Sequence, residues 1–375
     1  MLDLEFDQEQ ELLRQTVRDV LAKHCGLDVV REMEDDPVGY PEALWTQLAE
    51  LDLIGLLLPD EHGGAGMTLV EGVALYEELG RALAPVPHFV SAVMSGGVLA
   101  AAGSDAQKER WLPSIAAGTA IFTPAWLEPE NGFTPRGVEL EATPSDGGFR
   151  LSGIKRHVLF AAAADRLVVL ARTGDEAEAV DLFLVDPKVP GVTLRQQFSI
   201  ASDTQYEVRF ADVLVGEADR IGPAGSGWGA WQGVLQDGLV LLAAQAVGGA
   251  RYALEITTQY AKDRKQFDKP LGAFQALAHY LADAVTNLDG AEQLVHEAAW
   301  AGATGRPLTS LAPMAKVFAC STFRDITAMA QQLFGGIGFT LDFDIQLYFR
   351  RAKQQHLMWS DDRVLQDAVA AALLD

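Results

Sequence analysis

The chain has 375 residues, and its 49% hydrophobic and 8% aromatic residues are enough to bury the cores of two or three domains. Its 52 acidic residues outnumber the 29 basic ones, and the formal net charge of −23 opposes binding to nucleic acid or to anionic membranes. We therefore expect neither partner, and a polyanionic ligand must meet a local basic cluster.

The N-terminal residues MLDLEFDQEQELL begin acidic, without a basic segment ahead of an apolar stretch. No uninterrupted run in the chain approaches about 18 apolar residues. These features predict a soluble, cytoplasmic protein. The two cysteines, Cys25 and Cys320, have no CxxC or zinc-type spacing, so we expect buried thiols, no disulfide and no metal site.

Residues 1–120 are predicted to form an α-helical domain. Asp7 precedes a run whose apolar residues recur on one helical face: Leu12, Leu13, Val17, Val20 and Leu21. Pro41 suits the first position of the next helix. Capping-box spacing, which predicts a helix start, occurs twice, at Thr68 to Glu71 and at Ser104 to Gln107.

Residues 121–226 change to short β-branched or aromatic runs divided by Gly, Pro and Asp, which predicts a compact β domain. The runs are GGFRLSG, RLVVLART, DLFLVDP, VTLRQQF and YEVRFADVLV. Asp146-Gly147-Gly148 is predicted to be a hairpin turn. Long helical patterns return after GPAGSGWG, so residues 227–375 are predicted to form a second helical domain.

The segment YAKDRKQFDKPLGAFQ, residues 260–275, joins a basic helix end to a turn and presents Arg264, Gln266, Phe267 and Gln275. Arg264 offers a planar fork for phosphate oxygens, Phe267 can cover a ring, and Gln275 can hydrogen-bond a base edge. A pyrophosphate-bearing cofactor fits this pattern. Cations at the negative end of a helix would look the same.

QQLFGGIGFT, residues 331–340, is a second candidate segment. Its glycines, Gly335, Gly336 and Gly338, let the backbone approach a ligand or adopt positive φ, and Gln332 supplies an amide. A helix stop has the same pattern. A third Gly-rich segment, PDEHGGAG at residues 59–66, is best interpreted as a turn.

Together, YxxxRxxFxxPLxxFQ (260–275), QxxGGxGF (332–339) and PDEHGG (59–64) resemble motifs of the acyl-CoA dehydrogenase family. The resemblance covers essentially the whole chain. It implies an α+β fold with an N-terminal helical domain (1–120), a middle β-barrel (121–226) and a C-terminal four-helix bundle (227–375). It also implies FAD between barrel and bundle, with its diphosphate and adenosine reached across the interface of a dimer or tetramer.

The chemistry of this family requires a base that removes the proton α to a thioester carbonyl while the β-hydride goes to flavin N5. Aligning the family tract RDAKxYxxYEGT on Ala352-Lys353 puts Trp359 where that tract has Glu. The second location that the family uses falls at Gly238. Both base positions therefore lack a carboxylate, although the Trp359 N–H could still donate to a thioester oxygen. Asp237 adjoins Gly238 but points about 100° away on a helix.

The acidic residues after Trp359 have a structural interpretation. Ser360 is predicted to be a helix N-cap, with Asp361 and Asp362 in the first turn, where each negative charge is favourable by about 0.3–1 kcal/mol.

The segments that resemble the flavin-ring side of the family site also depart from its pattern. AWLEPENGFTP keeps Glu128-Pro129 after Trp126 but has Leu127 in place of a Thr. In GIKRHVL, His157 replaces a Trp and Leu159 a hydroxyl residue, and an Arg that often follows the second base position is Leu239. His157 could face the flavin or pack as a structural residue.

This combination resembles a base-lacking subunit of a heteromeric family member, and we favour that interpretation. The implied reaction is α,β-dehydrogenation of an acyl-CoA, with bulky groups such as steroid side chains among the expected substrates. A homologous partner in a heterotetramer, or a homo-oligomer, is expected. The alternatives are a self-sufficient enzyme that uses Asp237, a non-oxidative acyl-CoA flavoprotein, and a non-catalytic scaffold without flavin.

Overall fold

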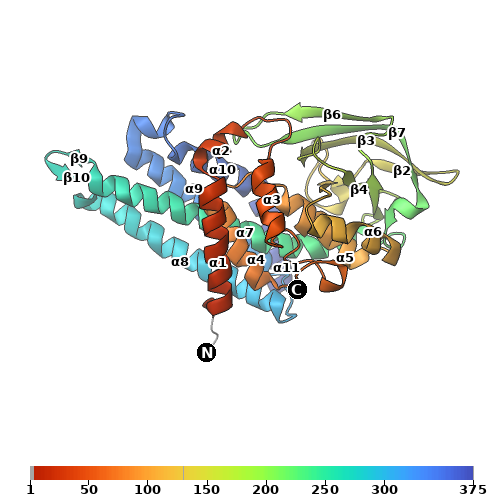
Figure 1. Cartoon of the computed structure of the whole chain (residues 1–375), viewed down its shortest axis with the longest axis horizontal. Helices are drawn as coiled ribbons and strands as arrows, with labels where there is room; N and C mark the ends of the chain where they lie inside the picture. The colour runs from red at the N-terminus through yellow and green to blue at the C-terminus, as the bar shows by residue number, and fades with distance from the viewer. Residues whose placement is uncertain (1–3, 130, 375) are drawn as a thin grey trace. The chain divides into compact units, whose positions relative to one another are not determined.

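The computed structural model describes residues 4–129 and 131–374 (Figure 1). Helices come first along the chain, then strands, then helices again, which confirms the predicted order. The chain divides into two compact units, one of residues 1–30, 68–84 and 239–375, and the other of residues 31–67 and 85–238. The three domain ranges expected from the sequence stay a prediction.

The first unit is mainly helical, with one short hairpin at residues 265–270. Its elements are α1 (Gln8–His24), α4 (Leu69–Arg81), the C-terminal part of α7 (Gly227–Asp263), α8 (Gln275–Ala303), α9 (Leu311–Phe334), α10 (Ile345–Leu357) and α11 (Asp362–Leu374). Two glycines bring backbones together, because a Cβ would lie 1.9 Å from the Gln245 oxygen at Gly80 and 1.8 Å from the Glu77 oxygen at Gly248. The helices α4 and α7 therefore pack in backbone contact.

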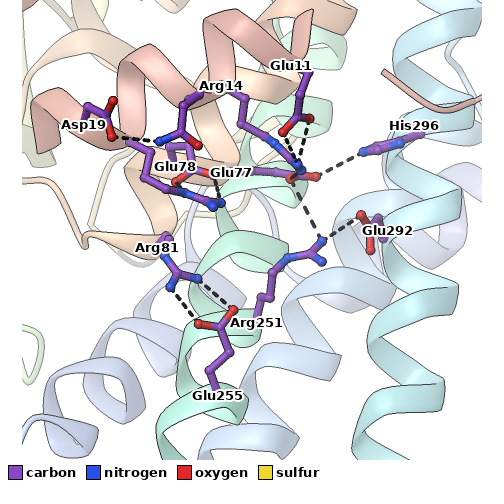
Figure 2. A network of polar contacts seen from close by, with 12 residues as sticks. Glu11, Arg14, Asp19, Glu77, Glu78, Arg81, Arg251, Glu255, Glu292 and His296 are labelled. Carbon is purple, nitrogen blue, oxygen red and sulfur yellow. Dashed lines mark hydrogen bonds and ion pairs between the residues drawn. The ribbon is translucent and has the colours of Figure 1, made fainter. Parts of the chain in front are cut away.

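Polar contacts at Glu77 join four helices of this unit (Figure 2). The Glu77 carboxylate lies 3.1 Å from His296 Nε2, 3.9 Å from Arg14 and 4.0 Å from Arg251. Arg251 also lies 2.8 Å from Glu292. Ligand atoms of Glu77, Glu292 and His296 lie within 4.8 Å of one another, a spacing that could hold a cation. Two guanidinium groups already balance these carboxylates, so we interpret the network as structural.

Helix starts follow the predicted capping chemistry. Capping boxes are present at Thr68 and Ser104, as the sequence predicted, and a further one is present at Asp7. Two predictions were wrong by one residue. Pro41 is the N-cap of α3 (Glu42–Glu50) and not its first helical residue. At α11, the carboxylate of Asp361 accepts from the Val364 N–H at 2.9 Å, so Asp361 is the capping residue and not Ser360.

The second unit combines helices with one sheet. Its helical elements are α3, the π-helical η2 (Phe89–Gly96), α5 (Gly97–Ala102), α6 (Asp105–Ala116) and the start of α7, while α2 (Leu27–Glu32) lies where the two units divide. The eight-stranded sheet has the order β6-β7-β3-β2-β4-β5-β8, with β1 paired to β4. The strands are β1 (Phe122–Ala125), β2 (Glu141–Ser145), β3 (Gly148–Leu159), β4 (Arg166–Arg172), β5 (Val180–Val185), β6 (Val192–Gln197), β7 (Gln205–Gly216) and β8 (Arg220–Ile221).

The sheet confirms the predicted β region and its hairpin turn. Strands β2 and β3 pair through Asp146-Gly147, where Gly147 has φ 83°. The β3–β7 register shifts between Lys155 and Val158, and the shifted segment contains His157 at φ 55°. A bulge of this kind breaks the regular alternation of side chains between the two faces of the sheet. Strands β1, β2 and β8 were not predicted, because each is short and β2 is mostly polar.

The long helix α7 has no uninterrupted run of 18 apolar residues but is apolar on average. By length and composition it could cross a membrane, because one 18-residue window has a mean hydropathy of 1.3. That window is 72% buried inside the structure, as in the core helix of a soluble protein.

The thiols of Cys25 and Cys320 are both buried, as predicted, and burial raises the pKa of Cys25 to about 12.

Candidate functional site

Residues 264–275 form an exposed hairpin between α7 and α8. Strands β9 (Lys265–Gln266) and β10 (Lys269–Pro270) pair across the turn Phe267-Asp268, whose φ angles are 52° and 60°. Two successive left-handed residues define a tight hairpin turn, which neither Phe nor Asp favours as Gly does. Phe267 is 86% exposed at its tip, and Arg264, Gln266 and Gln275 are exposed as well. The hairpin therefore holds cationic, amide and aromatic groups in solvent.

The glycine-rich segment is a turn at the end of α9. This helix ends at Phe334 and continues into the 3-10 turn η6 (Gly335–Phe339). Gly335 has φ 66°, and a Cβ at Gly335 or Gly336 would meet nothing within 4 Å. The positive φ accounts for Gly335, whereas neither packing nor a positive φ accounts for Gly336, and the open backbone at both would let a ligand come close. The Gln332 side chain is exposed.

The structure brings these two segments into contact. Tyr260 and Phe334 stack with ring centroids 4.2 Å apart and an interplanar angle of 18°. Tyr260 opens the first motif, and Phe334 precedes the first glycine of the second. An exposed guanidinium, exposed amides and open backbone at two glycines suit the phosphates and polar edges of a dinucleotide. The residues present therefore fit the FAD that the sequence resemblance implies.

Trp359, at the first base position, is buried, and the backbone on both sides of it accepts hydrogen bonds from a lysine. It is 5% exposed with φ 60°, and Ser360 follows with φ 124°. Lys316 on α9 is fully buried and donates to the carbonyl oxygens of Ser360 at 2.8 Å and His356 at 3.1 Å. Burial lowers the pKa of Lys316. Lys316 thus fixes the segment that presents Trp359, whose indole cannot accept the proton.

A histidine close to this segment is already engaged. Arg324 donates to His356 Nε2 at 3.1 Å, and an Asp362 oxygen lies 3.4 Å from the same nitrogen. Burial lowers the pKa of His356, and Arg324 opposes its protonation while Asp362 favours it. This contact pattern makes His356 a structural acceptor and not a ready general base. Neither Lys316 nor His356 could be predicted from the sequence as part of this arrangement, because no local motif joins α9 to residues 356–360.

At the second base position, Gly238, a longer side chain would have to displace neighbouring side chains. A Cβ there would lie 2.8 Å from Met94 Sδ and 3.1 Å from Phe89 Cζ, both on the π-helical η2. The adjacent Asp237 is accessible to solvent, and the surrounding protein raises its pKa to about 6 by desolvation. A carboxyl with that pKa suits proton transfer near neutral pH. Asp237 therefore remains the candidate for a relocated base.

The loop that carries Trp126 and Leu127 is held by a buried ion pair. Lys155 Nζ lies 2.6 Å from Glu128 Oε1 and donates to the Trp126 oxygen at 3.2 Å. Glu128 also accepts the N–H groups of Glu139 and Leu140. Burial lowers the pKa of Lys155 to about 8, although Glu128 opposes this shift. Lys155 and Glu128 thus hold the loop in place, whereas the Leu127 side chain has no hydroxyl group.

His157 and Leu159 lie on β3. His157 is exposed, its Nδ1 lies 2.6 Å from Gln205 Oε1, and its N–H donates to Gln197. It is therefore not the packed residue of the alternative interpretation, and its ring is oriented by Gln205. The Leu159 carbonyl accepts from the Thr123 hydroxyl at 2.7 Å, and its side chain is partly buried. The side chain of a leucine cannot donate a hydrogen bond to a ligand.

Comparison with protein families matches three models along the chain. The acyl-CoA dehydrogenase N-terminal domain matches residues 7–119, the middle domain residues 124–213 and the C-terminal domain residues 225–374. The models together span most of the chain in the order of the observed elements.

Individual relatives match over nearly their whole length. Benzylmalonyl-CoA dehydrogenase of Aromatoleum aromaticum is 31% identical over 92% of this chain and 93% of its own. The structure of butyryl-CoA dehydrogenase from Megasphaera elsdenii has a TM-score of 0.92 at 27% identity and covers 100% of both chains. A structure of the Tcur3481–Tcur3483 steroid ACAD has a TM-score of 0.87 at 30% identity, covering 98% of this chain and 99% of that one.

Proposed function

Since this chain belongs to the acyl-CoA dehydrogenase family of flavin-dependent oxidoreductases, we propose that it binds FAD and acts as the base-lacking subunit of a heteromeric acyl-CoA dehydrogenase. One contrast carries the proposal. The hairpin and glycine-rich turn expose groups suited to a dinucleotide, whereas position 359 holds a buried Trp and position 238 is closed by Met94 and Phe89. The partner would supply the carboxylate that these positions lack.

The roles of individual residues follow from their chemistry. FAD supplies the acceptor for the hydride that leaves Cβ of the acyl group. Arg264 would hold diphosphate oxygens through its fork of N–H donors, and Gln332 would bind with the open backbone of Gly335 and Gly336. Gln266, Phe267 and Gln275 complete the proposed set on the hairpin. The Trp359 N–H is proposed as a donor to the thioester oxygen, held in place through Lys316.

The flavin-ring side would be lined by Trp126, Leu127, His157 and Leu159. Their side chains provide apolar cover and one imidazole, but the side chains of Leu127 and Leu159 offer no hydrogen bond to a ring. The proposed ring side therefore binds less specifically than the adenosine side. We assign to it cofactor cover and not proton transfer.

Two further parts of the proposal concern the substrate and the setting. The Tcur3481–Tcur3483 relative is named as a pair and as a steroid ACAD, which supports a heteromer that acts on a bulky acyl-CoA. A cytoplasmic location is proposed, supported by the burial of α7 as a core helix.

Asp237 supports a second candidate function, a self-sufficient dehydrogenase. Its carboxyl is accessible, and its pKa of about 6 would let it act as a base. Asp237→Asn separates the two candidates. A self-sufficient enzyme would lose about 10²–10⁴-fold in turnover, whereas a heteromer with the base on its partner would keep its turnover.

The test is co-expression with any homologous acyl-CoA dehydrogenase chain that is encoded beside this one. Flavin absorbance gives FAD content, native mass spectrometry gives subunit stoichiometry, and turnover is measured for the complex and for this chain alone. We expect a flavin-containing complex that is active only with its partner. A chain that purifies without flavin in every assembly would instead favour the scaffold, and rapid turnover by the homomer would favour Asp237.

A further inference from the structure

Gln331, immediately before Gln332, is a buried amide without partners. Its side chain is 3% exposed, and neither Oε1 nor Nε2 has a hydrogen-bond partner among residues 4–129 and 131–374. Folded proteins pair nearly all such groups, because an unpaired buried polar group is costly. An apolar side chain would fill the same space without that cost. The amide therefore needs an explanation beyond packing.

Its position links it to the glycine-rich turn. Gln331 lies in the last turn of α9, and its own carbonyl accepts the N–H of Gly335. Gly338, the buried glycine of the turn, lies over the amide, since a Cβ there would be 2.7 Å from Gln331 Oε1. Most of the turn above it is exposed, including Gly336, Ile337 and Phe339. The amide is thus covered by the same turn that we propose to bind FAD.

We propose that Gln331 is a positioning residue for this turn, and that its amide gains partners when a dinucleotide draws residues 335–339 into their ligand-bound arrangement. The inference rests on the proposed function. A Gln amide has two donors and one acceptor oxygen, which match the N–H and C=O groups of a peptide turn. Gly335 and Gly336 allow the backbone to shift, because a Cβ at either position would contact nothing within 4 Å.

If the Gln331 amide gains hydrogen bonds only when FAD binds, those hydrogen bonds contribute to the affinity for FAD. A group that is unsatisfied without ligand and satisfied with it contributes to affinity by its different free energy in the two states. Gln331 would therefore strengthen FAD binding without touching FAD. Gln332 is exposed on the same helix end and is proposed to touch the ligand directly.

Gln331→Met tests the inference, because Met has a similar length and no amide. The variant is made in the full chain, with its partner present if the wild type needs it to bind FAD. Melting of the flavin-free protein and the dissociation constant for added FAD are both measured. We expect the flavin-free variant to melt about 1–3 °C above the wild type, since two unpaired groups are removed. We expect its FAD dissociation constant to rise about tenfold.

Gln332→Met is the matched control. It should weaken FAD binding while leaving the melting of the flavin-free protein unchanged, because that side chain is already solvated. If Gln331→Met misfolds, Gln331→Leu serves as the second variant.

Three results would overturn the inference. Flavin-free melting that is lowered or unchanged in both Gln331 variants would show that the amide is not an unpaired group. Unchanged FAD affinity, with a wild type that binds FAD, would contradict the coupling alone and leave the proposed function standing. Absence of FAD binding by the wild type in every assembly would remove both proposals.

Discussion

Solvent exposure differs between two regions of the molecule. The segments that resemble dinucleotide-binding motifs are exposed, whereas the two positions that resemble base sites are buried. Phe267 is 86% exposed at the tip of its hairpin, and the backbone at Gly335 and Gly336 is open. Trp359 is 5% exposed, and a Cβ at Gly238 would strike Met94 and Phe89. If our proposed function is correct, cofactor binding and proton abstraction are separable in this fold. The first depends on exposed backbone and side chains, and the second depends on one carboxylate at one place.

The loop proposed to lie on the flavin-ring side is held by a buried ion pair. The side chains of Leu127 and Leu159 cannot donate hydrogen bonds, but the buried Lys155–Glu128 pair holds the loop that carries Leu127. This support would be needed whether or not the chain removes a proton itself. The comparison can therefore be tested by perturbing each region separately.

The largest effect is expected from Lys155→Met. The substitution leaves Glu128 buried without its cation, and breaking a buried pair costs about 3–5 kcal/mol. Denaturant unfolding measures the loss. Arg150→Met on the same strand is the control, because its pair with Asp212 is exposed and should be worth less than about 1 kcal/mol. Equal losses for the two variants would show that the buried pair is not the support of the loop.

Trp359→Glu should restore part of the missing proton abstraction. Position 359 already holds a non-glycine residue at φ 60°, so Glu adds no new backbone strain there, and burial would raise its pKa toward a useful range. We expect flavin bleaching by a saturated acyl-CoA, mixed anaerobically, to accelerate about a hundredfold, within the range of a positioned base. Recovery should be incomplete because Leu127, Leu159 and Leu239 remain.

Gly238→Glu is the matched control for this gain. Its Cβ would lie 2.8 Å from Met94 Sδ, so the carboxylate cannot be placed without displacing neighbours, and no acceleration is expected. If Trp359→Glu binds FAD and acyl-CoA but bleaches no faster than the wild type, the missing carboxylate is not the limiting defect.

Arg264→Ala should weaken FAD binding by about tenfold to a hundredfold, the size of a charge-assisted hydrogen bond. Because Arg264 is exposed, the unfolding free energy of the flavin-free chain should not change. Lys265→Ala, also exposed on the hairpin, controls for general loss of positive charge and should change affinity less. Full retention of FAD by Arg264→Ala would remove Arg264 from the site.

The smallest effect concerns His296, in the polar network of Figure 2. Burial lowers the pKa of His296, but its hydrogen bond and charge interaction with Glu77 outweigh this, and the pKa is raised. Protonated His296 therefore stabilises the fold fully below pH about 6.5. This stabilisation should fade as pH rises through the higher folded-state pKa.

The expected loss across that window is on the order of 1 kcal/mol, the size of one hydrogen bond. Unfolding free energies measured at several pH values should show it in the wild type and not in His296→Gln. FAD affinity at fixed pH should be the same in both proteins. A wild-type curve that rises over this window would contradict the assignment.

Local patterns predicted much of the fold. The capping boxes at Thr68 and Ser104 and the turn at Gly147 were confirmed because each rests on contacts between near neighbours in the sequence. The cap of α11 was placed one residue early, since Ser360 and Asp361 are both good capping residues and only the backbone conformation separates them.

The contacts that define the candidate site could not be predicted in this way. Lys316 reaches carbonyls 40 and 44 residues away, and no motif encodes which backbone oxygens a buried Lys will meet. Closure of Gly238 depends on Met94 and Phe89 from a distant π-helical segment. Stacking of Tyr260 on Phe334 likewise required the helices to be packed. Motif order identified the family, but three-dimensional packing determined which positions are open.

The most direct test of the central claim is anaerobic mixing of the FAD-loaded wild-type chain with a saturated acyl-CoA, followed by flavin absorbance. We predict that the oxidised flavin band persists with this chain alone and disappears when the partner subunit is present. Prompt loss of the band with the chain alone, abolished by Asp237→Asn, would contradict the account and show that the chain carries its own base.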